Sequence, residues 1–122
     1  DRALVLCDQL KLPIEECRLK LELAWRDHRA RRFADGLLRA REGIEIARAL
    51  NVPPLLDELL HVLGVMESSA LNPRKNFLRA LDVLEQARQG AEARKHPRLH
   101  WEVLHAMANI YRERGNMDLS SQ

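Results

Sequence analysis

Several residue types are scarce or missing in this chain of 122 residues, and each absence narrows the range of folds. Threonine is absent and valine and isoleucine are few, so the residues that favour β-strands are poorly represented. Aromatic residues make up only 4% of the chain, whereas leucine and alanine are abundant. This composition predicts an all-α protein whose helices pack through small and medium-sized side chains.

Cysteine and long apolar runs are also scarce. Cys7 and Cys17 fit no metal-binding or redox spacing and lie in helical patterns, so we expect buried free thiols. Free thiols favour a reducing compartment, and the expected localisation is therefore cytoplasmic. The sequence contains no signal peptide and no apolar run of about 18 residues, so we expect no membrane partner.

The charges are nearly balanced, with 20 basic and 18 acidic residues and a formal charge of +2. A mixed surface of this kind does not indicate a nucleic-acid partner, because binding to a phosphate backbone needs a basic patch. Two short basic clusters stand out, "RDHRARR" at 26–32 and "LNPRKN" at 71–76. Each could meet an acidic partner, or could be a solvated helix end or loop.

The sequence repeats with a period of 40 to 44 residues. "QLKLPIEECRLKLELAW" at 9–25 aligns with "ALNVPPLLDELLHVLGV" at 49–65 at an offset of 40, and the segment around Pro97 follows at an offset of 44. Phe33, Phe77 and Met117 begin the second halves of the units. A repeat of this length predicts that each unit is one helical pair that buries its apolar face against its neighbours.

Each unit is predicted to contain two helices. A Pro opens the first helix, where its missing N–H has no intrahelical role. We expect first helices at 14–30, 54–69 and 98–114, and second helices at 33–50 and 74–93, the latter capped by Asn72 before Pro73. Residues with helical spacing that we expect to be core are Leu19, Leu23, Ala24, Leu56, Leu59, Leu60, Leu63, Leu104, Met107, Ala108 and Tyr111, together with Trp101.

The predicted domain organisation is one solenoid fragment over residues 1–122. It comprises the end of a preceding repeat (1–12), two repeats (13–52 and 53–96) and an incomplete repeat (97–122), with about five full helices plus two truncated ones. Gly115 is expected to form the last turn before a helix that starts at Met117. We therefore expect the chain to be a slice of a longer array, with apolar ends through which a homodimer could form.

The third unit carries a resemblance to a known family. In "MANIYRERGNMDLSS", small residues at Ala108 and Ser120, an aromatic residue at Tyr111 and Gly115 at the turn resemble the tetratricopeptide repeat. Asp27 and Glu67 stand where Tyr111 stands, and the period exceeds the strict 34 residues. Long units are similar to helical arrays of bacterial diguanylate cyclases and transcription activators. The resemblance implies a right-handed α-solenoid of antiparallel helix pairs.

The resemblance also implies that the first helices line a concave binding face. The residues expected there are Arg18, Leu21, Trp25, His28, Arg29, His61, Val65, Ser68, Glu102, His105, Asn109 and Arg112. Trp25 is either an aromatic anchor for a peptide or an inter-repeat packing residue. A carboxylate clamp of His105, Asn109 and Arg112 would lack a member, because Val65 stands where an Asn would help.

We find no motif for catalysis, and the prediction is a protein that is not an enzyme and needs no cofactor. His96 and His100 have metal-ligand spacing, but no third ligand accompanies them. The leading hypothesis is a module that binds a peptide or partner domain. The alternatives are a sensory region of a bacterial signalling protein that binds a small ligand or an intramolecular domain, and a structural spacer.

Overall fold

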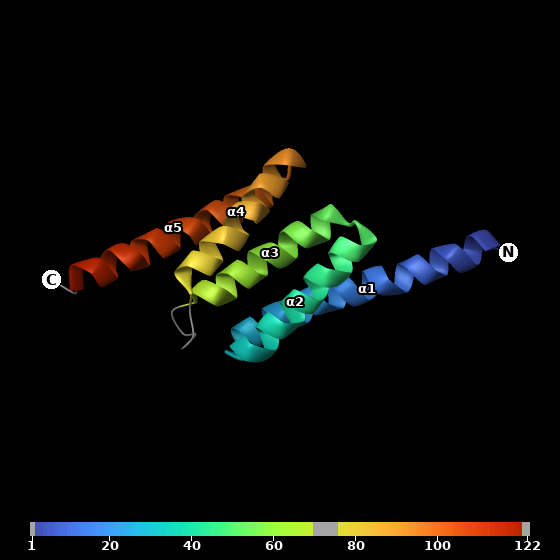
Figure 1. The fold of residues 1–122 in the computed structure, drawn as a ribbon, viewed down its shortest axis with the longest axis horizontal. Helices are drawn as coiled ribbons and strands as arrows, with labels where there is room; N and C mark the ends of the chain where they lie inside the picture. Colours follow the sequence, from blue (N-terminus) through green and yellow to red (C-terminus); the bar gives the residue numbers. More distant parts are fainter. Residues whose placement is uncertain (1, 70–75, 121–122) are drawn as a thin grey trace.

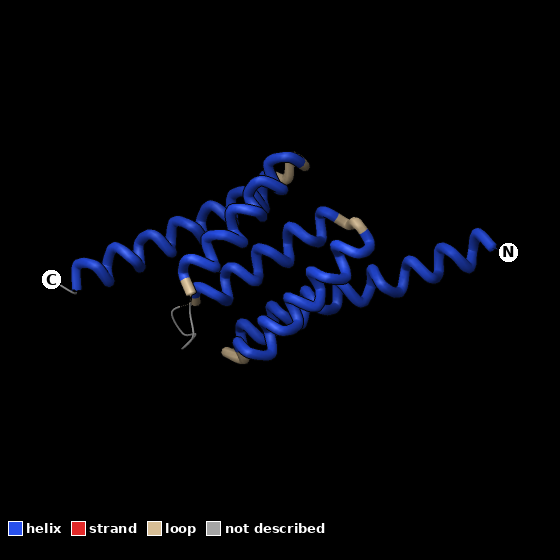
Figure 2. Tube along the Cα trace, viewed as in Figure 1, coloured by secondary structure: helices blue, strands red, loops and turns tan. Residues whose placement is uncertain are grey.

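The computed structural model describes residues 2–69 and 76–120, and side chains within 13–69 and 76–114. As predicted, this part of the chain contains helices joined by short turns and no strand. Its elements are α1 (Arg2–Arg29), α2 (Phe33–Leu50), α3 (Pro53–Ser68), α4 (Phe77–Ala93) and α5 (Pro97–Ser120) (Figure 2). None of the described helices combines the length and the apolar character that crossing a membrane requires.

Local sequence explains the ends of the central helices. Asn51 adopts the left-handed conformation with φ 55° and ends α2, and Pro53 opens α3 two residues later. The N-cap of α4 is Asn76, whose side chain accepts a hydrogen bond from the backbone N–H of Arg79. Helix α4 thus begins later than the predicted residue 74, and the expected cap at Asn72 lies outside the described residues.

Both long helices correct the sequence prediction. Helix α1 runs through Pro13, and α5 runs through Gly115, so the two truncated helices expected at the ends are continuous with their neighbours. A proline removes one helical hydrogen bond, and a helix can continue past it where both flanks form helix well. A glycine permits a turn without requiring one and costs a helix only about 1 kcal/mol relative to alanine.

Consecutive helices pack side by side along the chain. Helices α1 and α2 form one pair and α3 and α4 another, and α5 lies against α4 (Figure 1). The central helix α3 also contacts both α1 and α5, whereas in the described residues no Cα atom of α1 lies within 8 Å of one of α5. The first helix of each predicted unit therefore lies on a common side, with α3 between the other two.

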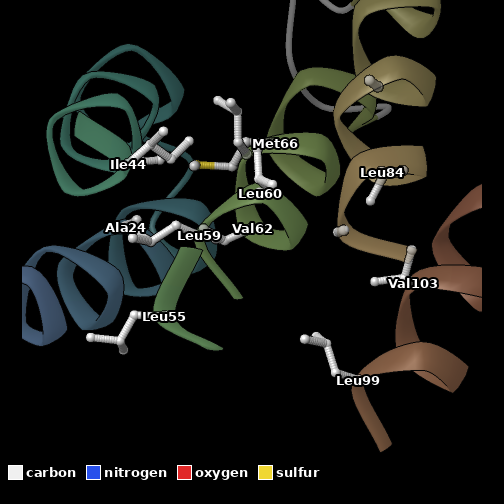
Figure 3. Packing of buried hydrophobic residues seen from close by; sticks show 14 of the residues in the cluster. Ala24, Ile44, Leu55, Leu59, Leu60, Val62, Met66, Leu84, Leu99 and Val103 are labelled. Carbon is white, nitrogen blue, oxygen red and sulfur yellow. The ribbon is translucent and has the colours of Figure 1, made fainter. Parts of the chain in front are cut away.

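A single apolar core joins these helices. Figure 3 shows Met66 of α3 reaching toward Ile44 of α2, while Leu84 of α4 and Val103 of α5 lie on the opposite side of α3. Gly64 permits a close approach of α3 and α4, because a Cβ built there would overlap Cγ of Leu84. The small residue predicted for this position is thus required by helix packing.

The core stripe predicted for the third unit is largely wrong. Trp101, Leu104 and Tyr111 are 65%, 44% and 57% exposed, and Ala108 is exposed as well. The buried face of α5 is formed instead by Leu99, Val103 and Ile110. The prediction assumed a covering second helix, and no described helix packs on that side of α5. In the first unit, Leu19 of α1 was also predicted to be core but is 52% exposed.

Two buried carboxylates occupy the positions that align with Tyr111 in the sequence repeat. Asp27 and Glu67 are each only 2% exposed. Arg39 of α2 donates to Asp27 at 3.0 Å, and Glu67 accepts from Arg41 at 3.0 Å with Arg79 of α4 at 3.6 Å. Burial of a charge is tolerated when it is paired in this way. These contacts link first helices to second helices where the motif would use a ring.

Candidate binding groove

A groove lies along the first helices of the three units. Helix α3 forms its floor, and α1 and α5 form its two walls. Two adjoining cavities of about 400 and about 390 Å³ occupy it, and His61 and Glu102 line both. We call this surface the α1–α3–α5 groove.

Most of the residues predicted for the concave face line this groove. Ten of the twelve do so: Leu21, Trp25, His28, Arg29, His61, Val65, Ser68, Glu102, His105 and Asn109. Arg18 and Arg112 line neither cavity, and both are exposed. The repeat offset of 40 places Trp25 beside Val65, but in the structure Trp25 contacts His61, one helical turn earlier on α3. Neighbouring residues across the groove are therefore displaced by one turn from the repeat alignment.

Aromatic rings gather on both walls. On α1, Trp25 makes edge contacts with His28 and His61, with ring centroids 5.9 and 5.4 Å apart. On α5, the rings of Trp101 and His105 stack at 5.3 Å with an angle of 6° between their planes. Trp101 was predicted to be a core residue, but it forms the rim of the groove. Both tryptophans of the chain therefore face this one surface.

Burial favours the neutral forms of two histidines on the inner side of the groove, His28 and His61. Burial lowers the pKa of His28, and the nearby Arg29 lowers it further. Burial also lowers the pKa of His61, against an opposing effect of Glu102. Within the described residues, the buried Nδ1 atom of His28 has no hydrogen-bond partner, so no neighbour supports a proton there. Neither imidazole adds positive charge at neutral pH.

Charged groups line the groove unevenly. Arg98 of α5 lies 3.6 Å from Glu58 and 4.0 Å from Glu102, so one guanidinium serves two carboxylates. Arg29 lines the cavity of about 390 Å³ and Glu113 lines the cavity of about 400 Å³. Neither side chain has an ion-pair partner within 4.0 Å in the described part of the chain. The groove thus offers unpaired charge of both signs, separated along its length.

Several lining residues were missed by the sequence analysis: Glu58, Arg98, Leu99, Ser69, Trp101, Ala106 and Glu113. The repeat itself could have found three of them. Applying the offsets of 40 and 44 to Arg18 gives Glu58 and Glu102, and applying them to Arg29 gives Ser69 and Glu113. The prediction included Arg18, Glu102 and Arg29 but did not add the residues that the repeat offsets place at the equivalent positions of the other units.

The groove is lined by hydroxyl, aromatic, amide and charged side chains. The hydroxyl of Ser68 donates to the backbone oxygens of Gly64 at 2.9 Å and Val65 at 3.3 Å, which ties it to its own helix. Among the residues described, no three His, Cys, Asp or Glu side chains converge as a metal site would require. The groove instead combines aromatic faces, an amide and charges on an open surface, which are the features of a recognition site.

Comparison with protein-family models, with curated proteins and with solved structures finds no match to this chain.

Proposed function

We propose that this chain is a tetratricopeptide-like α-solenoid module that binds an extended peptide, or an extended segment of a partner domain, in the α1–α3–α5 groove. The 40- to 44-residue repeat and the side-by-side order of consecutive helices support the solenoid architecture. The observation that carries the function is the groove itself. It crosses three helices that come from three different repeats, and ten predicted concave-face residues meet in it.

The shape of the groove favours an extended ligand. Two cavities of similar volume lie next to each other and share His61 and Glu102, so a chain could occupy both in succession. A small molecule is usually enclosed over most of its surface, whereas Trp101 and His105 at this rim are exposed. Rigid helices would present the aromatic groups without further ordering, which reduces the entropy loss on binding.

A random peptide library displayed on phage tests this proposal. Selection on the wild-type protein should enrich sequences that bind, and Val65→Arg should abolish their binding because it places a long charged side chain on the groove floor. Leu78→Arg is the matched control, since Leu78 is 71% exposed on α4 and lines neither cavity. Circular dichroism would establish that both variants are folded.

Two outcomes would overturn the proposal. Selection could enrich no peptide, or the enriched peptides could bind Val65→Arg and the wild type equally well. The alternative of a sensory region predicts a different result, in which a metabolite screen by thermal shift finds a stabilising small ligand whose binding is lost in Val65→Arg. The peptide hypothesis is favoured because the rim is open and the cavities are consecutive.

A further inference from the structure

An apolar stripe runs along the outer side of α5, where no described helix packs. Its members follow the spacing i, i+3, i+7 and i+10, which places them on one face of a helix, and they are Trp101, Leu104, Ala108 and Tyr111. All four are exposed, and among them only Trp101 also lines a groove cavity. We call these four residues the α5 outer stripe. A contiguous exposed apolar surface of this kind indicates an interaction surface.

The equivalent positions in the other two units are covered by a helix. In α3 they are Asp57, Leu60, Gly64 and Glu67, and all four are buried. Gly64 packs against α4, and Arg94 at the end of α4 pairs with Asp57. In α1, Asp27 is covered in the same way by Arg39 of α2. In both units, this side of the first helix is therefore where a further helix packs.

The α5 outer stripe lacks the acids of the covered positions. Asp27, Asp57 and Glu67 each pair with an arginine that belongs to the covering helix or directly follows it. In α5, Trp101 stands at the position of Asp57, and Tyr111 stands at the position of Asp27 and Glu67. A covering helix of the kind found in this chain would therefore bring arginines to a stripe that holds no carboxylate.

Arginines flank the α5 outer stripe on both edges. Arg98, Arg112 and Arg114 each lie three or four residues from a member of the stripe, a spacing that makes side chains neighbours on a helix surface. All three are exposed, and neither Arg112 nor Arg114 has a carboxylate within 4.0 Å among the side chains that the structure describes. Glu102 and Glu113 of α5 line the groove cavity instead. The edges of the stripe thus carry positive charge.

These charges disfavour a second copy of the chain on the stripe. If two α5 helices packed through it, antiparallel pairing would bring Arg98 of one copy beside Arg112 of the other, and parallel pairing would bring Arg112 beside Arg114. Like charges at such positions destabilise a helix pair. Helices of the α2 or α4 type are disfavoured for the same reason, because they bring Arg39 or Arg79 to the covered face. The stripe instead suits a helix that carries acids.

We infer that the α5 outer stripe binds an amphipathic helix of a partner protein, with an apolar seam that packs on the stripe and Asp or Glu residues on both sides of the seam. The carboxylates would pair with the three flanking arginines. Trp101 and Tyr111 supply large apolar surfaces toward the two ends of the stripe, and the small Ala108 permits close approach between them. Leu104, Ala108 and Tyr111 line neither cavity of the groove, so the inference does not depend on the proposed function.

Three designed helical peptides, each about three heptads long, test this inference. The Glu peptide has Leu and Ala at positions a and d and Glu at e and g, the Lys peptide has Lys at e and g, and the Ser peptide keeps Glu but has Ser at a and d. Like charges at e and g keep the peptides from pairing with themselves. In fluorescence anisotropy, the Glu peptide should bind about tenfold more tightly than either of the others, and added salt should weaken its binding.

Protein variants locate the binding surface. Leu104→Glu should abolish binding of the Glu peptide, because it places a carboxylate within the apolar contact. Leu38→Glu is the matched control, since Leu38 is 58% exposed on α2. Arg112→Gln should weaken binding about two- to fivefold, as expected for an exposed ion pair. Arg48→Gln, the same change at an exposed position on α2, should leave binding unchanged.

Several results would overturn the inference. The Lys peptide could bind as tightly as the Glu peptide, no peptide could bind, or Leu104→Glu could bind like the wild type. Loss of binding in Val65→Arg would place the peptide in the groove and not on α5. Self-association of the wild type in sedimentation experiments that Leu104→Glu removes would assign the stripe to a second copy of the chain. The peptide selection on the groove is read out separately, so either proposal can fail without the other.

Discussion

The close contact between Gly64 of α3 and Leu84 of α4 provides a prediction that can be worked out from the structure. In Gly64→Ala, the new Cβ would overlap Cγ of Leu84 and lie 2.6 Å from its Cδ2. Carbon atoms in contact are normally about 3.5 to 4.0 Å apart. Leu84 is fully buried and the overlap involves its branch carbon, so a rotation of the end of the side chain cannot relieve it. Helices α3 and α4 must therefore move apart.

Two effects of this substitution oppose each other. Replacing glycine by alanine inside a helix stabilises it by about 1 kcal/mol. Overpacking of a dense core destabilises by about 1 to 3 kcal/mol, and the position of the overlap places Gly64→Ala near the upper end of that range. We expect a net loss of about 2 kcal/mol in the free energy of unfolding, measured by urea denaturation followed by circular dichroism.

Ala108 and Leu84 provide the controls. Ala108 is the repeat equivalent of Gly64 and is exposed, so Ala108→Gly should report the propensity effect alone, about 1 kcal/mol of destabilisation. Leu84→Ala should cost about 2 to 5 kcal/mol. In the double variant, the methyl group at position 64 enters the vacated space, so the combined loss should be about 1 to 2 kcal/mol less than the sum. A Gly64→Ala protein that is more stable than the wild type, or strictly additive with Leu84→Ala, would refute the packing argument.

Three further predictions concern stability. Leu60 and Leu104 are equivalent in the repeat but are 4% and 44% exposed, so in chemical denaturation Leu60→Ala should destabilise by about 2 to 5 kcal/mol and Leu104→Ala by less than about 1 kcal/mol. Equal losses in the two variants would contradict the placement of α5. Arg94→Met should cost about 3 to 5 kcal/mol, since it leaves buried Asp57 without the two hydrogen bonds at 2.5 and 2.6 Å that Arg94 donates, and an unchanged urea midpoint would argue against this pair. The pKa of His61 is lowered by folding, so the unfolded chain binds more protons than the folded chain, and the free energy of unfolding should fall as the pH drops from 7 to 5. His61→Gln should reduce that fall, and a variant with the same pH dependence as the wild type would contradict the argument.

The sequence predicts the middle of this fold better than its ends. Helix α2 has the predicted bounds, and α3 begins one residue before the predicted start, because Asn51 and Pro53 specify the turn locally. Pro13 and Gly115 are equally good local markers of a break, yet the helices run through both. A local residue can permit a turn, but packing of the next helix decides whether the turn forms.

Burial on α5 was mispredicted for a related reason. The apolar spacing of Leu104, Ala108 and Tyr111 is that of a core stripe, and the side chains become core only where another helix covers them. The burial of Asp27 and Glu67 was not predicted, because a charged residue in a helix is expected to face solvent unless a partner of opposite charge is known. Asp27 and Glu67 meet arginines on other helices, at separations that no periodic pattern displays.

The candidate groove was largely predictable because it depends on the repeat. Equivalent positions of parallel first helices fall on one face, so the offsets of 40 and 44 locate most of the lining residues. The slant that brings Trp25 against His61 was not predictable, since it depends on the angles between helices. That slant decides which side chains share a cavity.

The most direct measurement of the central claim uses the two tryptophans as reporters. Trp25 lies on the α1 wall and Trp101 on the α5 wall, and each indole gives its own signal in a ¹H–¹⁵N spectrum. Titration with a peptide selected on the wild-type protein should shift both signals with the same midpoint, because one extended ligand contacts both walls. If saturating peptide leaves both signals in place, or shifts them with different midpoints, a single ligand does not occupy the groove and the account is contradicted.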